Sequence, residues 1–243
     1  MRDYLLDIVK NTYGLGIIDL IKVQGTDTET AIDSISADRS VIIKAKLNKP
    51  VPEFNGTFGM PNLSKLNTIL NCPEYATDAK ISLIYEQRNN ESVATGLHFE
   101  NQTGDYKNDY RFMLSEQVND KLKTVTFKRT PSYQVEFVPS VNSIQRLKFQ
   151  ANANSDETTF TTQIENGNLK VFIGDHSTHA GNFIFQSDVS GLTKKMSWPT
   201  SVVISILNLP GDKVYKISDD GVTQITVNSG LATYDFILPA FSK

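Results

Sequence analysis

One short stretch of this sequence occurs twice. Ile69-Leu70-Asn71-Cys72-Pro73 comes back as Ile206-Leu207-Asn208-Leu209-Pro210, about 137 residues later, a spacing far longer than the period of a solenoid repeat. Each copy ends a run of apolar residues at helical spacing that opens with a proline, Pro61 or Pro199. Proline at the start of a helix and just past its end is the expected punctuation. The repeat therefore predicts two similar domains in tandem.

The length of the chain suits this organisation. Its 243 residues give two domains of roughly 120 residues each, enough for two hydrophobic cores. Residues 115–130 are polar and charged, and they are interpreted as an extended connector between the halves. We therefore expect domain 1 over 1–114, the connector over 115–130 and domain 2 over 131–243.

The patterning of apolar residues predicts the same order of elements in each half, namely helix, strands, helix, strands. A helix is expected over Tyr4–Tyr13 and another after Ser140, which is a good N-cap residue. Expected strands include Ile17–Val23, Ala31–Ile35, Val41–Leu47, Glu53–Phe58, Ile81–Tyr85, Ser92–Phe99, Tyr106–Leu114, Tyr133–Phe137, Phe160–Glu165, Leu169–Ile173, Asn182–Val189, Leu192–Met196, Val214–Ser218, Val222–Val227 and Thr233–Leu238.

Helices and strands do not alternate one for one, so the sheets should be mainly antiparallel. The fold class is α+β, with two helices packed on the sheets of each half. Two helices cover only one face of a sheet, which leaves the other face for solvent or a partner.

Bulk properties exclude several classes of protein. No run of about 18 apolar residues is present, so no membrane span is expected. The first residues lack the basic start and apolar block of a secretory signal, and the single Cys72 cannot form an internal disulfide, so the expected location is the cytoplasm. The net charge of -3 argues against a general polyanion binder, but not against one whose basic residues gather on one surface.

Little in the sequence points to catalysis. His176 and His179 lie with Asp175 in a polar turn, where they could bind a metal or serve a hydrolase, but the turn itself is the simpler interpretation. No nucleophile elbow, phosphate-binding glycine loop or paired cysteines occur. We expect no enzyme activity, no metal and no cofactor.

Basic residues recur on the expected helices. Lys10 and Arg146 lie on the side away from the apolar stripe, with Arg2 just ahead of the first helix, Lys65 on a flank and Lys148 nearer the buried side. A single lysine on a helix is usually only solvated, but this set recurs on equivalent helices in two similar halves. The fourth helix has only Ser201, Ser205 and Asn208, and Asp3 and Asp7 share the face of Lys10.

The chain resembles the DNA sliding clamps, most closely the trimeric clamps of T-even-type bacteriophages and more distantly proliferating cell nuclear antigen. The resemblance covers essentially the whole chain and rests mainly on the order of the elements. Segments that carry it are Tyr133–Ser140 leading into Ile144–Leu147, Asn166–Val171, Asn208–Asp212 and the terminal Tyr234–Pro239.

The resemblance implies a homotrimeric ring of two-domain subunits joined head to tail, with helices lining the hole. Strand Tyr106–Leu114 of one subunit would pair with strand Asn182–Val189 of the next. Arg2, Lys10, Lys65, Arg146 and Lys148 would contact double-stranded DNA through phosphates, without reading its sequence. Such a ring is a processivity factor that tethers the replicative polymerase.

The family's docking pocket for the polymerase, the clamp loader and other replication factors lies beside the connector and the carboxy-terminal tail. The corresponding residues here are Leu122, Val125, Phe127, Phe236, Leu238 and Pro239, for which core packing is the alternative. A viral tail or neck ring protein is the alternative function for the whole chain. If the chain is viral, its location is the cytoplasm of the host cell.

Overall fold

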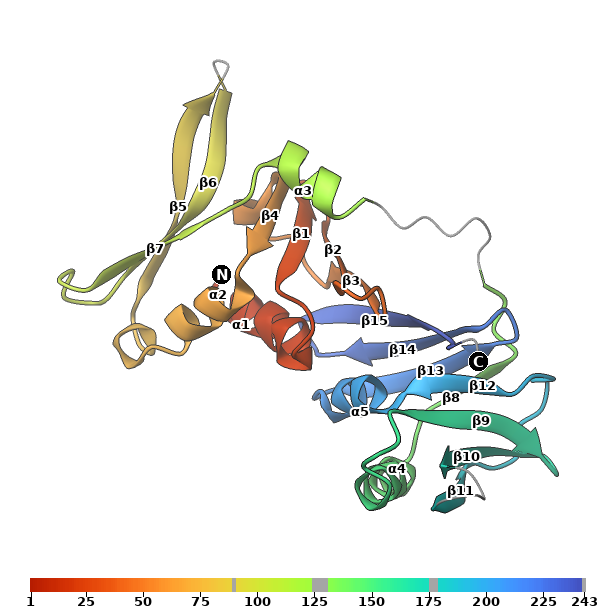
Figure 1. The fold of residues 1–243 in the computed structure, drawn as a ribbon. Coiled ribbons are helices and arrows are strands. Elements are labelled where there is room, and N and C mark those ends of the chain that lie inside the picture. Colours follow the sequence, from red (N-terminus) through yellow and green to blue (C-terminus); the bar gives the residue numbers. More distant parts are fainter. Residues whose placement is uncertain (89–90, 124–130, 175–178, 242–243) are drawn as a thin grey trace. The chain divides into compact units, whose positions relative to one another are not determined.

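The computed structural model describes residues 1–88, 91–123, 131–174 and 179–241. The chain divides into two compact units. Unit 1 comprises Met1–Arg39, Ile43–Val125 and Gly230–Tyr234; unit 2 comprises Ser40–Ile42, Thr126–Ser229 and Asp235–Lys243. Each unit combines helices with antiparallel sheets, which confirms the α+β class (Figure 1).

Unit 1 contains strands in the order β4-β1-β2-β3 and a separate three-stranded sheet of order β5-β6-β7. Its helices are α1 (Arg2–Asn11), α2 (Leu63–Leu70) and α3 (Ser115–Lys121), with 3-10 turns at Tyr13–Leu15, Pro52–Phe54 and Pro73–Tyr75. Its strands are β1 (Leu20–Gly25), β2 (Thr30–Ile35), β3 (Ile42–Leu47), β4 (Gly56–Pro61), β5 (Lys80–Arg88), β6 (Glu91–Glu100) and β7 (Lys107–Arg111).

Unit 2 contains strands in the order β15-β14-β13-β8 and a sheet of order β11-β10-β9-β12. Its helices are α4 (Val141–Ala153) and α5 (Thr200–Asn208). Its strands are β8 (Val135–Phe137), β9 (Thr159–Glu165), β10 (Asn168–Gly174), β11 (Ala180–Gln186), β12 (Met196–Pro199), β13 (Asp212–Ser218), β14 (Val222–Asn228) and β15 (Ala232–Pro239), of which β15 has residues in both units.

Local sequence signals explain several boundaries. The Ser140 side chain accepts a hydrogen bond from the Ser143 N–H, which confirms it as the N-cap of α4. Asn166 and Gly167 have φ values of 51° and 75°, so they form the tight turn that joins β9 to β10. Gly25 is required because a Cβ there would lie 1.9 Å from the Phe54 carbonyl oxygen.

Three expected elements differ in the structure. Residues Ser115–Lys121 form α3 rather than an extended connector, because Val118 and Leu122 are one helical turn apart and both bury their side chains. The expected strand over Glu53–Phe58 begins only at Gly56, after a 3-10 turn that Pro52 starts. The expected strand over Leu192–Met196 is also displaced, since β12 begins at Met196.

Each unit has its own core beneath its helix pair. In unit 1, the buried faces of α1 and α2 supply Leu5, Ile8, Val9, Leu63, Leu66, Ile69 and Leu70. In unit 2, Trp198 is completely buried and its indole N–H donates to the Thr162 hydroxyl at 2.8 Å. Trp198 is therefore a packing residue of this core.

Candidate nucleic-acid interface

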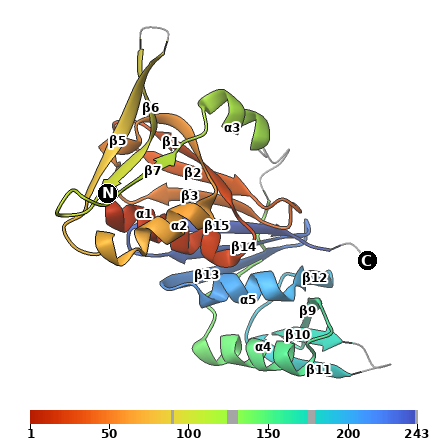
Figure 2. The same cartoon turned by 60° about the vertical axis from the view of Figure 1, so that its left-hand side comes forward.

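Each unit contains a pair of helices that contact one another, α1 with α2 and α4 with α5. Figures 1 and 2 both show α1 beside α2. The repeated sequence contributes α2 to one pair and α5 to the other. Because α1, α2 and α5 bury their apolar stripes, their polar side chains lie on the surface that each pair presents.

Lys10 is exposed at the end of α1, beside an open groove of about 620 Å³ between α1 and α2. Asp3 and Asp7 line the same groove. The two Asp7 carboxylate oxygens accept hydrogen bonds from the Asn11 amide at 3.2 Å and the Tyr234 hydroxyl at 2.8 Å. Burial, with the Asp7 charge, raises the pKa of Tyr234 well above its usual value, so the phenol keeps its proton and donates it. Asp3 remains as the exposed carboxylate on the face of Lys10.

Arg2 is half-buried, and its guanidinium donates to the Leu70 carbonyl oxygen at 2.9 Å. Leu70 is the last residue of α2, where unpaired carbonyl groups and the helix dipole favour a cation. Arg2 is therefore a fixed positive charge that ties α1 to the end of α2.

Lys65 is exposed in the first turn of α2. It lines a smaller cleft of about 300 Å³ between α2 and β7, together with Arg111, Phe112 and Met113. The first N–H groups of α2 are occupied within the chain, since the Leu63 and Ser64 N–H groups donate to Asp19 at 3.3 and 3.4 Å.

On α4, Arg146 is exposed and Lys148 is half-buried. Lys148 lies close enough to Lys213 of β13 to affect its titration. Burial lowers the pKa of Lys213, the Asp212 carboxylate raises it, and the Lys148 ammonium lowers it. Lys213 is thus a further basic residue near Lys148, which the sequence did not reveal because β13 lies far from α4 along the chain.

Helix α5 presents only neutral polar groups. Ser201 and Asn208 are exposed, and Ser205 is half-buried. These groups can donate hydrogen bonds to phosphate without adding charge.

Strands β7 and β11, which the sequence resemblance expects to pair between subunits, each lie at the end of a sheet, as do β4, β5, β8 and β12. β7 is the last strand of β5-β6-β7, and β11 is the last strand of β11-β10-β9-β12. The charged residues of β7 are paired within its own sheet: Lys107 with Glu100 at 3.1 Å, Asp109 with His98 at 2.7 Å, and Arg111 with Glu86 at 3.1 Å. β11 contains no charged residue.

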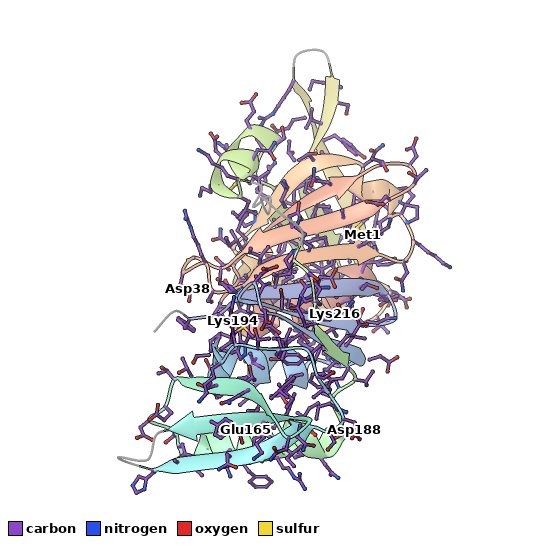
Figure 3. The ribbon with its side chains drawn as sticks, turned by 90° about the vertical axis from the view of Figure 1, so that its right-hand side faces the viewer. Met1, Asp38, Glu165, Asp188, Lys194 and Lys216 are labelled. Atoms are coloured by element: carbon purple, nitrogen blue, oxygen red, sulfur yellow. The ribbon has the colours of Figure 1, made fainter. Side chains whose placement is uncertain are left out.

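Charges on other strands are also paired within one sheet. Lys170 contacts Glu165 at 2.9 Å, and Lys216 contacts Glu136 at 3.2 Å. Glu165 and Lys216 are labelled in Figure 3, as is Asp188, which follows β11. These pairs lie on strands, whereas Lys10, Lys65, Arg146 and Lys148 lie on helices.

The predicted docking residues are mostly part of the core. Leu122 is 7% exposed, and Phe236 and Leu238 are 0% exposed, so their side chains contribute to packing rather than to a surface. Pro239 is exposed at the end of β15. Val125 and Phe127 lie outside the described residues.

Of the residues considered for metal binding, His179 is exposed, and Asp175 and His176 lie outside the described residues. Within the described ranges, no three His, Cys, Asp or Glu side chains are arranged to hold a metal ion. The described helices also include none that is long and apolar enough to cross a membrane.

Comparison with known proteins places this arrangement in a known fold. No protein-family model and no curated protein matches the chain. Among solved structures, the chain is similar to one described as the C-terminal region of FEN-1 bound to A. fulgidus PCNA, with a TM-score of 0.70 and 8% identity, over 100% of this chain and 97% of that one. PCNA from Thermococcus kodakaraensis gives a TM-score of 0.65 and 11% identity, over 99% and 97%. The chain therefore has the fold of the PCNA sliding clamps along its whole length.

Proposed function

We propose that this chain is the subunit of a DNA sliding clamp, a processivity factor that encircles duplex DNA and tethers a replicative polymerase. The observation that carries the proposal is the similarity of fold to PCNA over the whole of both chains. Within the clamps, the sequence resemblance favours the trimeric clamps of T-even-type bacteriophages. The protein would then act in the cytoplasm, which is that of the host cell if the chain is viral.

The assembled form in this proposal is a homotrimer joined head to tail. Its domains are 1–114 and 131–243, linked by 115–130. β7 of one subunit pairs with β11 of the next, an arrangement supported by the position of both strands at sheet ends. Head-to-tail contacts close into a ring when the rotation between subunits allows it, and closure then leaves neither strand as an open edge.

The inner surface in this proposal holds DNA weakly. Lys10, Lys65, Arg146 and Lys148 contact phosphates, assisted by Lys213 and by the hydroxyl groups of α5, with Arg2 as a fixed charge behind them. Encirclement keeps the ring on DNA, so binding need not be tight. Phosphate contacts carry no sequence information and therefore permit sliding. The activity requires no catalytic residue.

The proposed partners are the polymerase and the clamp loader. The FEN-1 segment in the structure of A. fulgidus PCNA is a precedent for a terminal peptide as the bound partner. By analogy, the exposed Pro239 marks the carboxy-terminal side of a docking surface here. Phe236 and Leu238, which precede Pro239 on β15, would support that surface from beneath.

A test of encirclement compares DNA ends. The protein is incubated with a linear duplex that is tethered at one end, and with the same duplex whose free end carries a bulky protein block. A ring threads over the free end, so bound protein should decrease several-fold when the end is blocked before incubation. Blocking after incubation should instead retain protein against a high-salt wash.

The order of blocking supplies the control, because both samples contain the same DNA, block and protein. Simple electrostatic binding is lost in high salt whichever order is used. Equal retention in the two orders would contradict the clamp proposal and favour the alternative of a structural ring protein that does not slide on DNA.

A further inference from the structure

One helix of unit 2 exposes a large aromatic side chain that the proposed DNA contacts do not use. Phe149 of α4 is 73% exposed. An exposed phenyl ring gains free energy when another apolar surface covers it. The position of Phe149 relative to β11 suggests what covers it.

Helix α4 lies against β11 (Figures 1 and 2). The Ser143 hydroxyl donates to the Phe185 carbonyl oxygen of β11 at 2.7 Å. At the other end of the strand, Gln150 occupies the space that a Cβ of Gly181 would fill, 1.9 Å from its Oε1. Phe149 precedes Gln150, so its side chain points about 100° around the helix axis from that of Gln150. It therefore projects into solvent near the first residues of β11.

The chain also contains, beside β7, a cleft large enough to hold a phenyl ring. The cleft of about 300 Å³ lies next to the last residues of β7 and is lined by Pro61, Lys65, Arg111, Phe112, Met113 and Gln117 among others. A cavity of about 150 Å³ is enough to bind benzene. Its lining combines apolar side chains with two cations, and a cation over a phenyl face is attractive.

The direction of strand pairing brings the ring and the cleft together. Neighbouring strands pair antiparallel in the β5-β6-β7 sheet, in the β11-β10-β9-β12 sheet, and where β1 pairs with β2 and β4 and β13 pairs with β14 and β8. If β11 of one copy continues the β5-β6-β7 sheet of another in the same sense, the Ala180 end of β11 lies opposite the Arg111 end of β7. Phe149 and the cleft occupy those two ends.

We infer that Phe149 of one subunit inserts into the α2–β7 cleft of the next subunit and anchors the contact between them. The partner is a second copy of this chain, because Phe149 and the cleft lie beside β11 and β7, the two strands that pair between subunits in the proposed ring. Charge does not oppose this contact, since β11 is uncharged and the charges of β7 are paired internally. The inference rests on the proposed ring and identifies the side chain that stabilises its closure.

The first experiment measures dissociation by light scattering over a dilution series for Phe149→Ala. We expect the protein concentration at half-dissociation to rise by about 30-fold, the effect of losing an interface hot spot. Val141→Ala is the matched control, because Val141 is 74% exposed on the same helix, two turns away, and its loss should change little. Circular dichroism should be unchanged for both variants, because each side chain is largely exposed.

The second experiment tests proximity directly. In a Cys72→Ser background, Phe149→Cys with Gln117→Cys should form intersubunit disulfides and give covalently closed trimers. Val141→Cys with Gln117→Cys should not, and neither should any single cysteine variant.

The outcomes separate this inference from the ring itself. A wild-type chain that stays monomeric at every concentration contradicts the ring and, with it, this contact. A wild-type trimer that is unaffected by Phe149→Ala and gives no cross-link overturns the Phe149 contact alone. The contact is likewise overturned if Phe149→Ala leaves the mass unchanged but weakens retention on DNA, because Phe149 would then face the DNA.

Discussion

Reversing two charges on the helices, Lys10→Glu with Arg146→Glu, is expected to weaken DNA binding by about 30- to 1,000-fold at low salt. A charge pair at 4 Å in water contributes about 1 kcal/mol, and each reversal replaces an attraction by a repulsion, so two reversals cost about 2–4 kcal/mol. The dependence of log K on log salt should become less steep by about 1.8, or about 0.9 for each phosphate that the variant no longer neutralises. A salt titration of binding to duplex DNA measures both quantities.

The matched control is Lys44→Glu with Lys121→Glu. Both lysines are exposed, on β3 and α3, outside the helices of the proposed DNA surface. Each reversal changes the charge by two, so either double variant moves the net charge of -3 by four units. Equal weakening by the two double variants would show a general charge effect and would contradict the proposed DNA surface.

Replacing Trp198 with alanine is expected to reduce the free energy of unfolding by about 3–5 kcal/mol. The side chain is completely buried on β12, opposite Phe160 of β9, and its loss leaves a large cavity. It also removes the donor to the Thr162 hydroxyl. Urea unfolding followed by circular dichroism measures the change, which should appear in the transition of unit 2.

Two further substitutions serve as comparisons, one that keeps the buried ring and one on an exposed aromatic side chain. Trp198→Phe keeps most of the buried ring but loses the N–H, so it should cost about 1–2 kcal/mol. Tyr85→Ala removes an aromatic side chain that is 58% exposed, and should change stability by less than about 0.5 kcal/mol. If Trp198→Ala were as mild as Tyr85→Ala, the described packing of unit 2 would be incorrect.

The sequence predicted most of the fold because its strongest signals are local. The apolar periodicity located α1, α2, α4 and α5, and Ser140 marked the start of α4 through a hydrogen bond made within one turn. The Asn166-Gly167 pair likewise determined a turn by its own backbone preference. Helix α3 was missed because it is short, with only Val118 and Leu122 buried, too few apolar residues to establish a period.

The candidate site was less predictable because it depends on residues that are distant in the chain. The proximity of Lys148 to Lys213, and the contact of Arg2 with Leu70, follow from packing and not from any motif. Burial is equally non-local: Phe236 and Leu238 resemble a docking motif in sequence, yet their strand places them in the core. The cleft beside β7 is formed by residues from three separate segments.

The mass of the protein in solution tests the central claim most directly. Light scattering over a dilution series should give about three times the chain mass of 27.1 kDa, decreasing toward one chain as the protein is diluted. That result would support the proposed homotrimer. A monomer at every concentration, or an open-ended assembly that grows with concentration, would contradict it.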